Sequence, residues 1–167
     1  VFEGGLAVFE KLVIGTDRSL PAVSDLITLD GQPYSAIPRS ITKPPGAAVE
    51  VALRPSVEQG EGTRYLFVSW DDGVTEPSRA LTKGEFTAAY DTEYLLTVNS
   101  LYGEPSPGGW YKAGTKVTVS VPPVVEEPGT KRIFTKWTGS FSTTDPVKAY
   151  TLWKPAEVTA LWRSEFQ

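Results

Sequence analysis

The residue types that most often carry out catalysis are scarce in this chain. It contains no His and no Cys, which removes the common nucleophile–base pairs and most transition-metal sites. Two carboxylate pairs remain, Asp71 with Asp72 and Glu126 with Glu127, and a pair of acids can hydrolyse a glycosidic bond. Each pair is adjacent in sequence within a polar turn, and neighbouring side chains of an extended segment point in opposite directions. We therefore predict that the chain is not an enzyme.

Calcium binding is the second chemistry that the sequence offers. In the stretch WDDGVTE at 70–76, Asp71, Asp72 and Glu76 are candidate oxygen ligands. Calcium prefers such carboxylate oxygens, but the spacing matches no EF-hand loop. An Asp-rich turn explains the same residues without an ion, so the sequence predicts no cofactor.

Composition and charge favour an exported protein. The chain starts at Val1 and has no Met, so we expect a processed mature protein or an excised fragment, with a secretory leader removed. No apolar run approaches the length of a membrane span. The net charge is −4 and the pI about 4.9, and no basic stripe suits nucleic acid. Cys and Met are absent and Asn occurs once, a depletion typical of hyperthermophile proteins. We predict an extracellular or cell-surface location.

One long strand is predicted in the middle of the chain. The segment FTAAYDTEYLLTV at 86–98 keeps a period of two with no Gly or Pro, and such alternation is typical of a strand. At about 3.3 Å per residue it would extend over roughly 43 Å, about twice the usual strand length. A sharp bend near 91–93, between two shorter strands, is the alternative.

An internal duplication explains this strand. The segments FVSWDDG, GAAVEVALRP, ITLDGQPY and EFTAAYDTEY match later segments at offsets of 67 to 72 residues, which are FTKWTGS (134–140), GTKVTVSVPP (114–123), LTVNSLYG (96–103) and EVTALWRSEF (157–166). The changes in offset fall in Gly- and Pro-rich turns, where insertions are tolerated. We predict module 1 over 26–94 and module 2 over 95–167, with 1–25 outside the repeat. The long strand would then end module 1 and begin module 2.

The fold class follows from the short strands in each module. Six short strands separated by Gly/Pro turns predict an all-β chain of two tandem Ig-like β-sandwich or small-barrel modules, with an extra N-terminal strand. Large aromatic side chains at repeated positions are expected to anchor the cores; these are Phe67, Trp70, Phe134, Trp137 and Trp162. Trp110 and Trp153 have no Trp counterpart in module 1 and, with Tyr111, are candidates for surface binding.

The spaced elements of module 2 resemble a known group of repeats. The pattern YLLTVNSLYGEPSPGGWYKAGTKVTVSV, RIFTKWTGS and VTALW is similar to the tandem β-repeats of archaeal and bacterial secreted and cell-surface proteins, related to divergent internalin-type B repeats. Module 1 keeps the skeleton but has PRS in place of GWY and WDD in place of WTG. The resemblance covers 26–167 and implies an extracellular, non-catalytic β-module.

The two ends of the chain suggest how copies of it would associate. The apolar segment GLAVFEKLVIG at 5–15 either completes the sheet of its own module or inserts into the next subunit as a donor strand. Donation is heterologous and would build a filament. The residues expected at such a subunit interface are Leu6, Val8, Leu12, Ile14 and Phe166.

Three functions therefore compete. The first is a structural subunit of a pilus- or thread-like extracellular filament that self-associates by strand donation. The second is a non-catalytic accessory or stalk module of a larger secreted or surface protein. The third is a carbohydrate- or surface-binding module, whose partner would be a surface polysaccharide bound by Trp110, Tyr111 and Trp153.

Overall fold

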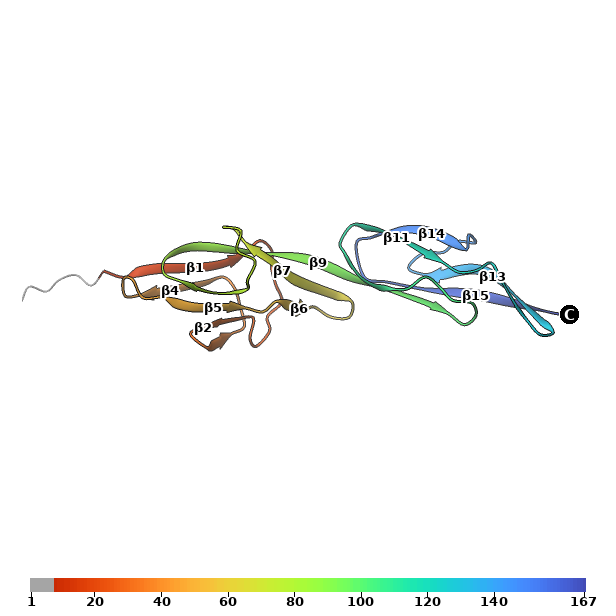
Figure 1. Ribbon diagram of the computed structural model, residues 1–167, viewed down its shortest axis with the longest axis horizontal. Coiled ribbons are helices and arrows are strands. Elements are labelled where there is room, and N and C mark those ends of the chain that lie inside the picture. The colour runs from red at the N-terminus through yellow and green to blue at the C-terminus, as the bar shows by residue number, and fades with distance from the viewer. Residues whose placement is uncertain (1–7) are drawn as a thin grey trace, which may run out of the picture. The chain divides into compact units, whose positions relative to one another are not determined.

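A computed structural model describes residues 8–167, and all regular structure within them is β-strand (Figure 1). The chain divides into two compact units. Unit 1 comprises the described residues 8–59 together with Arg64–Asp91. Unit 2 comprises Gly60–Thr63 and Thr92–Gln167. The prediction of an all-β chain is confirmed. Residues 8–167 contain no helix long and apolar enough to cross a bilayer.

Two sheets make up unit 1. Its strands are β1 (Glu10–Thr16), β2 (Ile27–Leu29), β3 (Gln32–Tyr34), β4 (Arg39–Lys43), β5 (Val49–Leu53), β6 (Ser56–Glu58), β7 (Thr63–Trp70), β8 (Ser78–Leu81) and the first half of β9 (Gly84–Ser100). One sheet has the order β4-β1-β9-β7-β6 and the other β3-β2-β5-β8. Asp30 and Gly31 join β2 to β3 with φ of 48° and 79°, as an Asp-Gly hairpin turn requires.

The core of unit 1 draws on both sheets. Leu12 and Ile14 of β1 are fully buried beside Val51 of β5, Trp70 of β7 and Tyr90 of β9. Alternation accounts for this, because every second residue of a strand points to the same face. The second sheet supplies its inner face in the same way, through the buried positions of β5.

Strand β1 is an internal strand of unit 1. It pairs antiparallel with β4, with Leu12 opposite Ile41, and parallel with β9, with Leu12 opposite Gly84. Of the two alternatives for the segment 5–15, this pairing is the one in which it completes the sheet of its own module. Residues 10–16 therefore pair with strands of their own unit.

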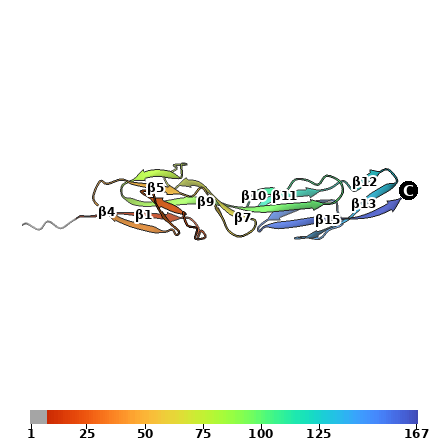
Figure 2. The ribbon, with the colours of Figure 1, turned by 90° about the horizontal axis from the view of Figure 1, so that it is seen from below.

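Unit 2 also consists of two sheets. Its strands are the second half of β9, β10 (Gly109–Lys112), β11 (Thr115–Ser120), β12 (Val124–Glu127), β13 (Thr130–Gly139), β14 (Val147–Leu152) and β15 (Ala156–Phe166). One sheet has the order β10-β9-β15-β13-β12, and the other pairs β11 with β14. Figure 2 shows β12, β13 and β15 side by side near the C-terminus. Trp137, Val119, Leu152 and Val158 are fully buried between these strands.

Strand β9 contains the long strand predicted at 86–98. It runs unbroken over 17 residues, which confirms that prediction. The boundary between the units falls inside it, between Asp91 and Thr92. Its first half pairs with β1 and β7, and its second half with β10 and β15.

Two expectations about strands are corrected. Residues 124–127, expected to be a turn because of the prolines around them, form β12 and pair with β13. The predicted equivalence of 27–34 with 96–103 is wrong, because β2 pairs with β3 and β5 whereas residues 96–100 pair with β15. Both segments alternate in the same way, and alternation carries no information about which strand is the partner.

Candidate functional site

The acidic turn after β7 is closed by protein groups. Arg79 Nη2 lies 2.8 Å from Asp72 Oδ2, and the hydrogen bond from Arg79 is the main reason that the pKa of Asp72 is lowered. The backbone carbonyl of Glu76 accepts a hydrogen bond from Trp70 Nε1 at 2.9 Å. Asp71 is exposed. Among residues 8–167, no three acidic side chains gather into a group that would hold a metal ion. The Arg79 guanidinium therefore pairs with the Asp72 carboxylate and helps to hold the turn.

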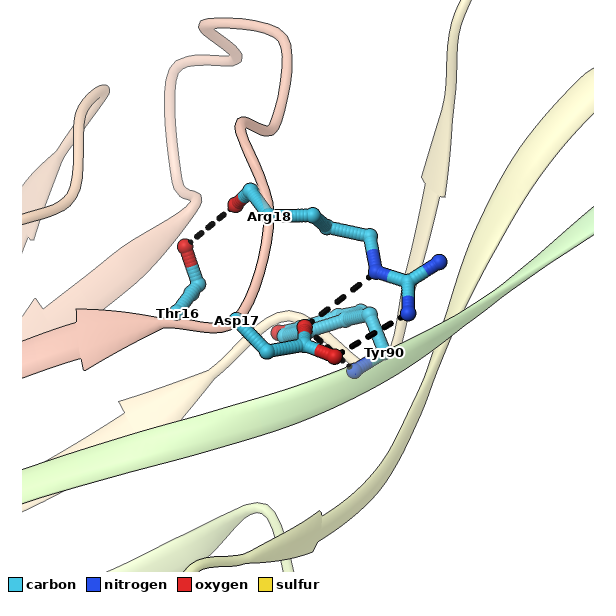
Figure 3. A network of polar contacts seen from close by, with 4 residues as sticks. All are labelled: Thr16, Asp17, Arg18 and Tyr90. Atoms are coloured by element: carbon cyan, nitrogen blue, oxygen red, sulfur yellow. Dashed lines mark hydrogen bonds and ion pairs between the residues drawn. The ribbon is translucent and has the colours of Figure 1, made fainter.

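A polar network ends strand β1 (Figure 3). Asp17 accepts hydrogen bonds from Arg18 Nη2 at 3.0 Å and from the Tyr90 amide at 3.1 Å. The Asp17 amide donates to the Ala88 carbonyl at 2.9 Å, and Thr16 Oγ1 donates to the Arg18 carbonyl at 2.6 Å. Burial raises the pKa of Asp17, but the hydrogen bonds from Arg18 and Tyr90 outweigh it, and the pKa is lowered overall. Asp17 thus extends the pairing of β1 with β9 beyond the last residue of β1.

The Tyr90 hydroxyl belongs to the core rather than to a reactive site. It donates to the Arg54 carbonyl at 2.9 Å, and burial raises its pKa. A phenol held in its protonated form is a poor general base. Its role is to satisfy a backbone carbonyl inside unit 1.

The most buried charge in residues 8–167 is Lys43, at the end of β4. Its Nζ lies 3.3 Å from Glu10 Oε2, and the two residues face each other across β1 and β4. The Gly46 amide also donates to Glu10 at 3.1 Å, and Lys83 Nζ lies 3.9 Å from Glu10 Oε1. The pKa of Glu10 is lowered, first by the Gly46 amide and then by Lys43. The sequence gives one sign of this pair: Ile41 and Lys43 are two residues apart in a strand, so their side chains point to the same face.

The Glu10–Lys43 ion pair should make the stability of unit 1 depend on pH. Because the folded state lowers the pKa of Glu10 below 4.5, the pair stabilises unit 1 above that value and the stabilisation is lost as the pH falls through the lower, folded pKa. We expect Glu10→Gln to be less stable than the wild type at pH 7, and this difference to shrink as the pH falls below 4.5. Denaturant unfolding at pH values from about 7 to about 3 measures this difference. Asp17 and Asp72 titrate equally in both proteins, so parallel stability curves would contradict a role for Glu10.

The surface of unit 2 has a hollow of about 320 Å³ beside the start of β15. Two carboxylates line it, from Glu61 and Glu157, together with Thr97 and Ser140. Glu157 Oε1 accepts a hydrogen bond from the Asn99 side-chain amide at 2.9 Å. Glu61 and Glu157 are the charged side chains of this lining, and Thr97 and Ser140 supply its hydroxyl groups.

A hollow of about 420 Å³ in unit 1 lies between β4 and the second sheet. The Arg39 guanidinium lies 4.2 Å from the centre of the Tyr34 ring and donates to the Ala36 carbonyl at 3.1 Å. Lys43 also lines this hollow, but its ammonium group is paired with Glu10. The cationic side chains here pack against groups of unit 1 itself.

The three aromatic residues predicted to bind a surface have different environments. Tyr111 packs against the core of unit 2, whereas Trp110, its neighbour in β10, is on the opposite face of that strand. Trp153 follows β14 and is 68% exposed, with its ring close to Gly114, where an added Cβ would lie 2.7 Å from Cη2 of the indole. Tyr111 therefore does not share an open face with Trp110.

The predicted core aromatics lie inside the two units. Trp70 and Trp137 are 1% and 0% exposed, and Phe67 and Trp162 are partly buried against the same cores. Phe134 is buried with its ring centre 5.7 Å from that of Trp137.

The residues predicted at a subunit interface fall into three groups. Leu12 and Ile14 are fully buried in the core of unit 1. Val8 and Phe166 are exposed, at 72% and 84%. Leu6 lies outside the described residues.

Comparison with known proteins gives no family for this chain. No protein-family model, no curated protein and no solved structure matches it. The resemblance to secreted and cell-surface repeats therefore remains a prediction from the sequence, and function has to be argued from the two units.

Proposed function

We propose that the two units are copies of one Ig-like β-sandwich module and that the chain is a structural, non-catalytic part of an extracellular surface assembly. The observation that carries the proposal is β9, one strand that ends the first unit and begins the second. No linker separates the units, which suits modules arranged in series within one polypeptide.

Equivalent hydrogen bonds support the duplication. In unit 1, Trp70 Nε1 donates to the Glu76 carbonyl at 2.9 Å. In unit 2, Trp137 Nε1 donates to the Pro146 carbonyl at 3.3 Å. Each Trp strand also bonds in the same way to the proline just before the preceding strand. The Phe67 amide donates to the Pro55 carbonyl at 2.8 Å, and the Phe134 amide donates to the Pro123 carbonyl at 2.9 Å.

The first strand of each unit also has the same partners. β1 pairs antiparallel with β4 and parallel with β9, where Leu12 is opposite Gly84. The second half of β9 pairs antiparallel with β10 and parallel with β15, where Leu96 is opposite Ala156. In this proposal β1 is the counterpart of the second half of β9, and the β2–β3 hairpin is an insertion in unit 1.

The contacts of β1 favour a stalk or accessory segment of a larger surface protein over a filament built by donating residues 5–15. Donation would remove the fully buried Leu12 and Ile14 from the core of unit 1 and break the pairing of β1 with both neighbours. Modules in series need no such exchange. The filament is the second candidate, because Val8 and Phe9, just before β1, are 72% and 59% exposed; in that case the donated segment is residues 1–9.

Immunogold microscopy of intact source cells, with antibodies raised against the purified chain, tests the proposal. We expect gold particles at the cell surface, and labelling that requires permeabilised cells would contradict an extracellular role. Denaturing electrophoresis of the labelled material separates the two candidates. A stalk predicts a polypeptide much larger than 18.2 kDa, whereas a filament predicts a subunit near that mass in large assemblies, which deletion of residues 1–9 would dissolve.

A further inference from the structure

The turn between β6 and β7 belongs to unit 2, and it has an equivalent at the far end of that unit. The Leu95 amide donates to the Gly62 carbonyl at 2.9 Å. The Gln167 amide donates to the Gly129 carbonyl at 3.2 Å. Gly62 immediately precedes β7 just as Gly129 immediately precedes β13, so the end of β15 repeats the hydrogen bond found at the middle of β9.

The two glycines have different surroundings. A Cβ on Gly62 would lie 2.9 Å from Cβ of Pro155 and 3.4 Å from Cβ of Leu95, so this turn packs closely against unit 2. A Cβ on Gly129 would meet no atom within 4 Å. Both glycines have positive φ, 86° and 74°. The same turn is therefore covered in one place and open in the other.

The end of β15 is open as well. Its pairing with β9 ends at Ala160, while its pairing with β13 continues to Phe166. The corresponding part of β9 is paired with β10, with Tyr94 opposite Tyr111. Tyr94 packs against the core of unit 2, whereas its counterpart Phe166 is 84% exposed. An aromatic side chain and a strand edge thus lie open beside the Gly129 turn.

The side chains closest to the Gly62 turn indicate what kind of module would cover the Gly129 turn. A Cβ on Gly62 would meet Pro155 and Leu95 of unit 2, and by strand register these two apolar residues correspond to Lys83 and Lys11 in unit 1. Lys11 is exposed and the Lys83 side chain is 71% exposed. Lysines at the positions of Leu95 and Pro155 would place charge where unit 2 has its closest apolar packing, and such burial is costly.

We infer that the end of unit 2 formed by the Gly129 turn and β15 residues 161–167 is a docking surface for a further β-module of the unit 2 type, with apolar residues at the positions of Leu95 and Pro155. The inference rests on the proposed duplication. The lysines at 11 and 83 disfavour a second copy of unit 1 as the occupant, because docking would bury their charge.

A chain with one added module tests the inference. Residues 1–166 are followed by a second copy of 95–167, so that Leu95 of the added copy follows Phe166 as the original Leu95 follows Tyr94. Hydrogen exchange of residues 127–130 and 161–166 is compared with that of the original chain. We expect exchange in both segments to slow by roughly tenfold or more, the change that about 1.4 kcal/mol of packing produces. The matched control has Leu95→Lys and Pro155→Lys within the added copy, and it should leave residues 127–130 exchanging as in the original chain.

Two outcomes of this experiment would contradict the docking inference. Equal protection by the lysine-bearing copy would overturn the inference, as would an added module that folds but leaves residues 127–130 unprotected. If the added module does not fold, L95K/P155K in the unextended chain decides, because it should speed exchange of the residue 95 amide, which donates to the Gly62 carbonyl; unchanged exchange of that amide would remove the premise. None of these results bears on where the protein is located, so the proposed extracellular role stands or falls separately.

Discussion

Replacing Trp137 with alanine is expected to lower the free energy of unfolding of unit 2 by about 3–5 kcal/mol. The indole is fully buried, its ring centre lies 5.7 Å from that of Phe134, and its Nε1 donates to the Pro146 carbonyl at 3.3 Å. Truncation leaves a large cavity and a carbonyl without its donor, and both effects are destabilising. Native-state hydrogen exchange read separately in each unit measures the loss.

Trp153→Ala is the matched control, because this indole is 68% exposed. Its removal is expected to change the stability of unit 2 by less than about 1 kcal/mol. Trp70→Ala should reproduce the Trp137 effect in unit 1, since Trp70 has the same burial and an equivalent indole hydrogen bond. A loss below about 1 kcal/mol for Trp137→Ala would show that the closing Trp of the strand is not a core anchor.

The sequence predicts those features of the fold that depend on local alternation. Strand β9 could be read directly, because its period of two continues over many residues without Gly or Pro. The F-x-x-W segments could be read as core strands, since their large aromatic side chains recur at matching positions of the two segments. Strand β12 was missed because its short apolar run lies between prolines, and composition alone assigns such a segment to a turn.

Partner choice could not be predicted from alternation. Residues 27–34 resemble 96–103 by period and residue type, yet β2 pairs with β3 and β5 whereas residues 96–100 pair with β15. The β2–β3 hairpin lies between β1 and β4, and under the proposed duplication it shifts β1 out of the offset that relates the other segments. Glu10 interrupts the apolar pattern of the segment. The fold explains this charge, because Glu10 lies opposite Lys43 in the β1–β4 pair.

The candidate sites were less predictable than the fold. Asp71, Asp72 and Glu76 are close in sequence, but Asp72 forms an ion pair with Arg79 of β8. The position of Arg79 depends on how β8 pairs, which the sequence does not reveal. Trp110 and Tyr111 are neighbours, and strand geometry turns Tyr111 toward the core and Trp110 away from it. Sequence spacing places such residues near each other without saying which face each one occupies.

Replacing Leu12 or Ile14 of β1 with alanine is expected to destabilise unit 1 by about 2–5 kcal/mol in each case. Both side chains are fully buried, and β1 is held between β4 and β9 in the middle of a sheet. The cavity therefore opens in the centre of unit 1, where the surrounding strands have little room to relax. Urea unfolding of the purified chain measures the loss, with hydrogen exchange assigning it to unit 1.

Val8→Ala provides the control, because this side chain lies just before β1 and is 72% exposed. It should leave the stability of the isolated chain within about 0.5 kcal/mol of the wild type. If β1 instead serves a neighbouring subunit, the effect of Leu12→Ala depends on protein concentration, because a contact between chains contributes to stability by mass action. A loss that is the same at low and high protein concentration places β1 in its own unit, and any donated segment must then lie in residues 1–9. A loss of stability that disappears on dilution would favour strand donation by β1 itself. In that case the dilute chain already lacks the donated strand, so the substitution has nothing left to weaken.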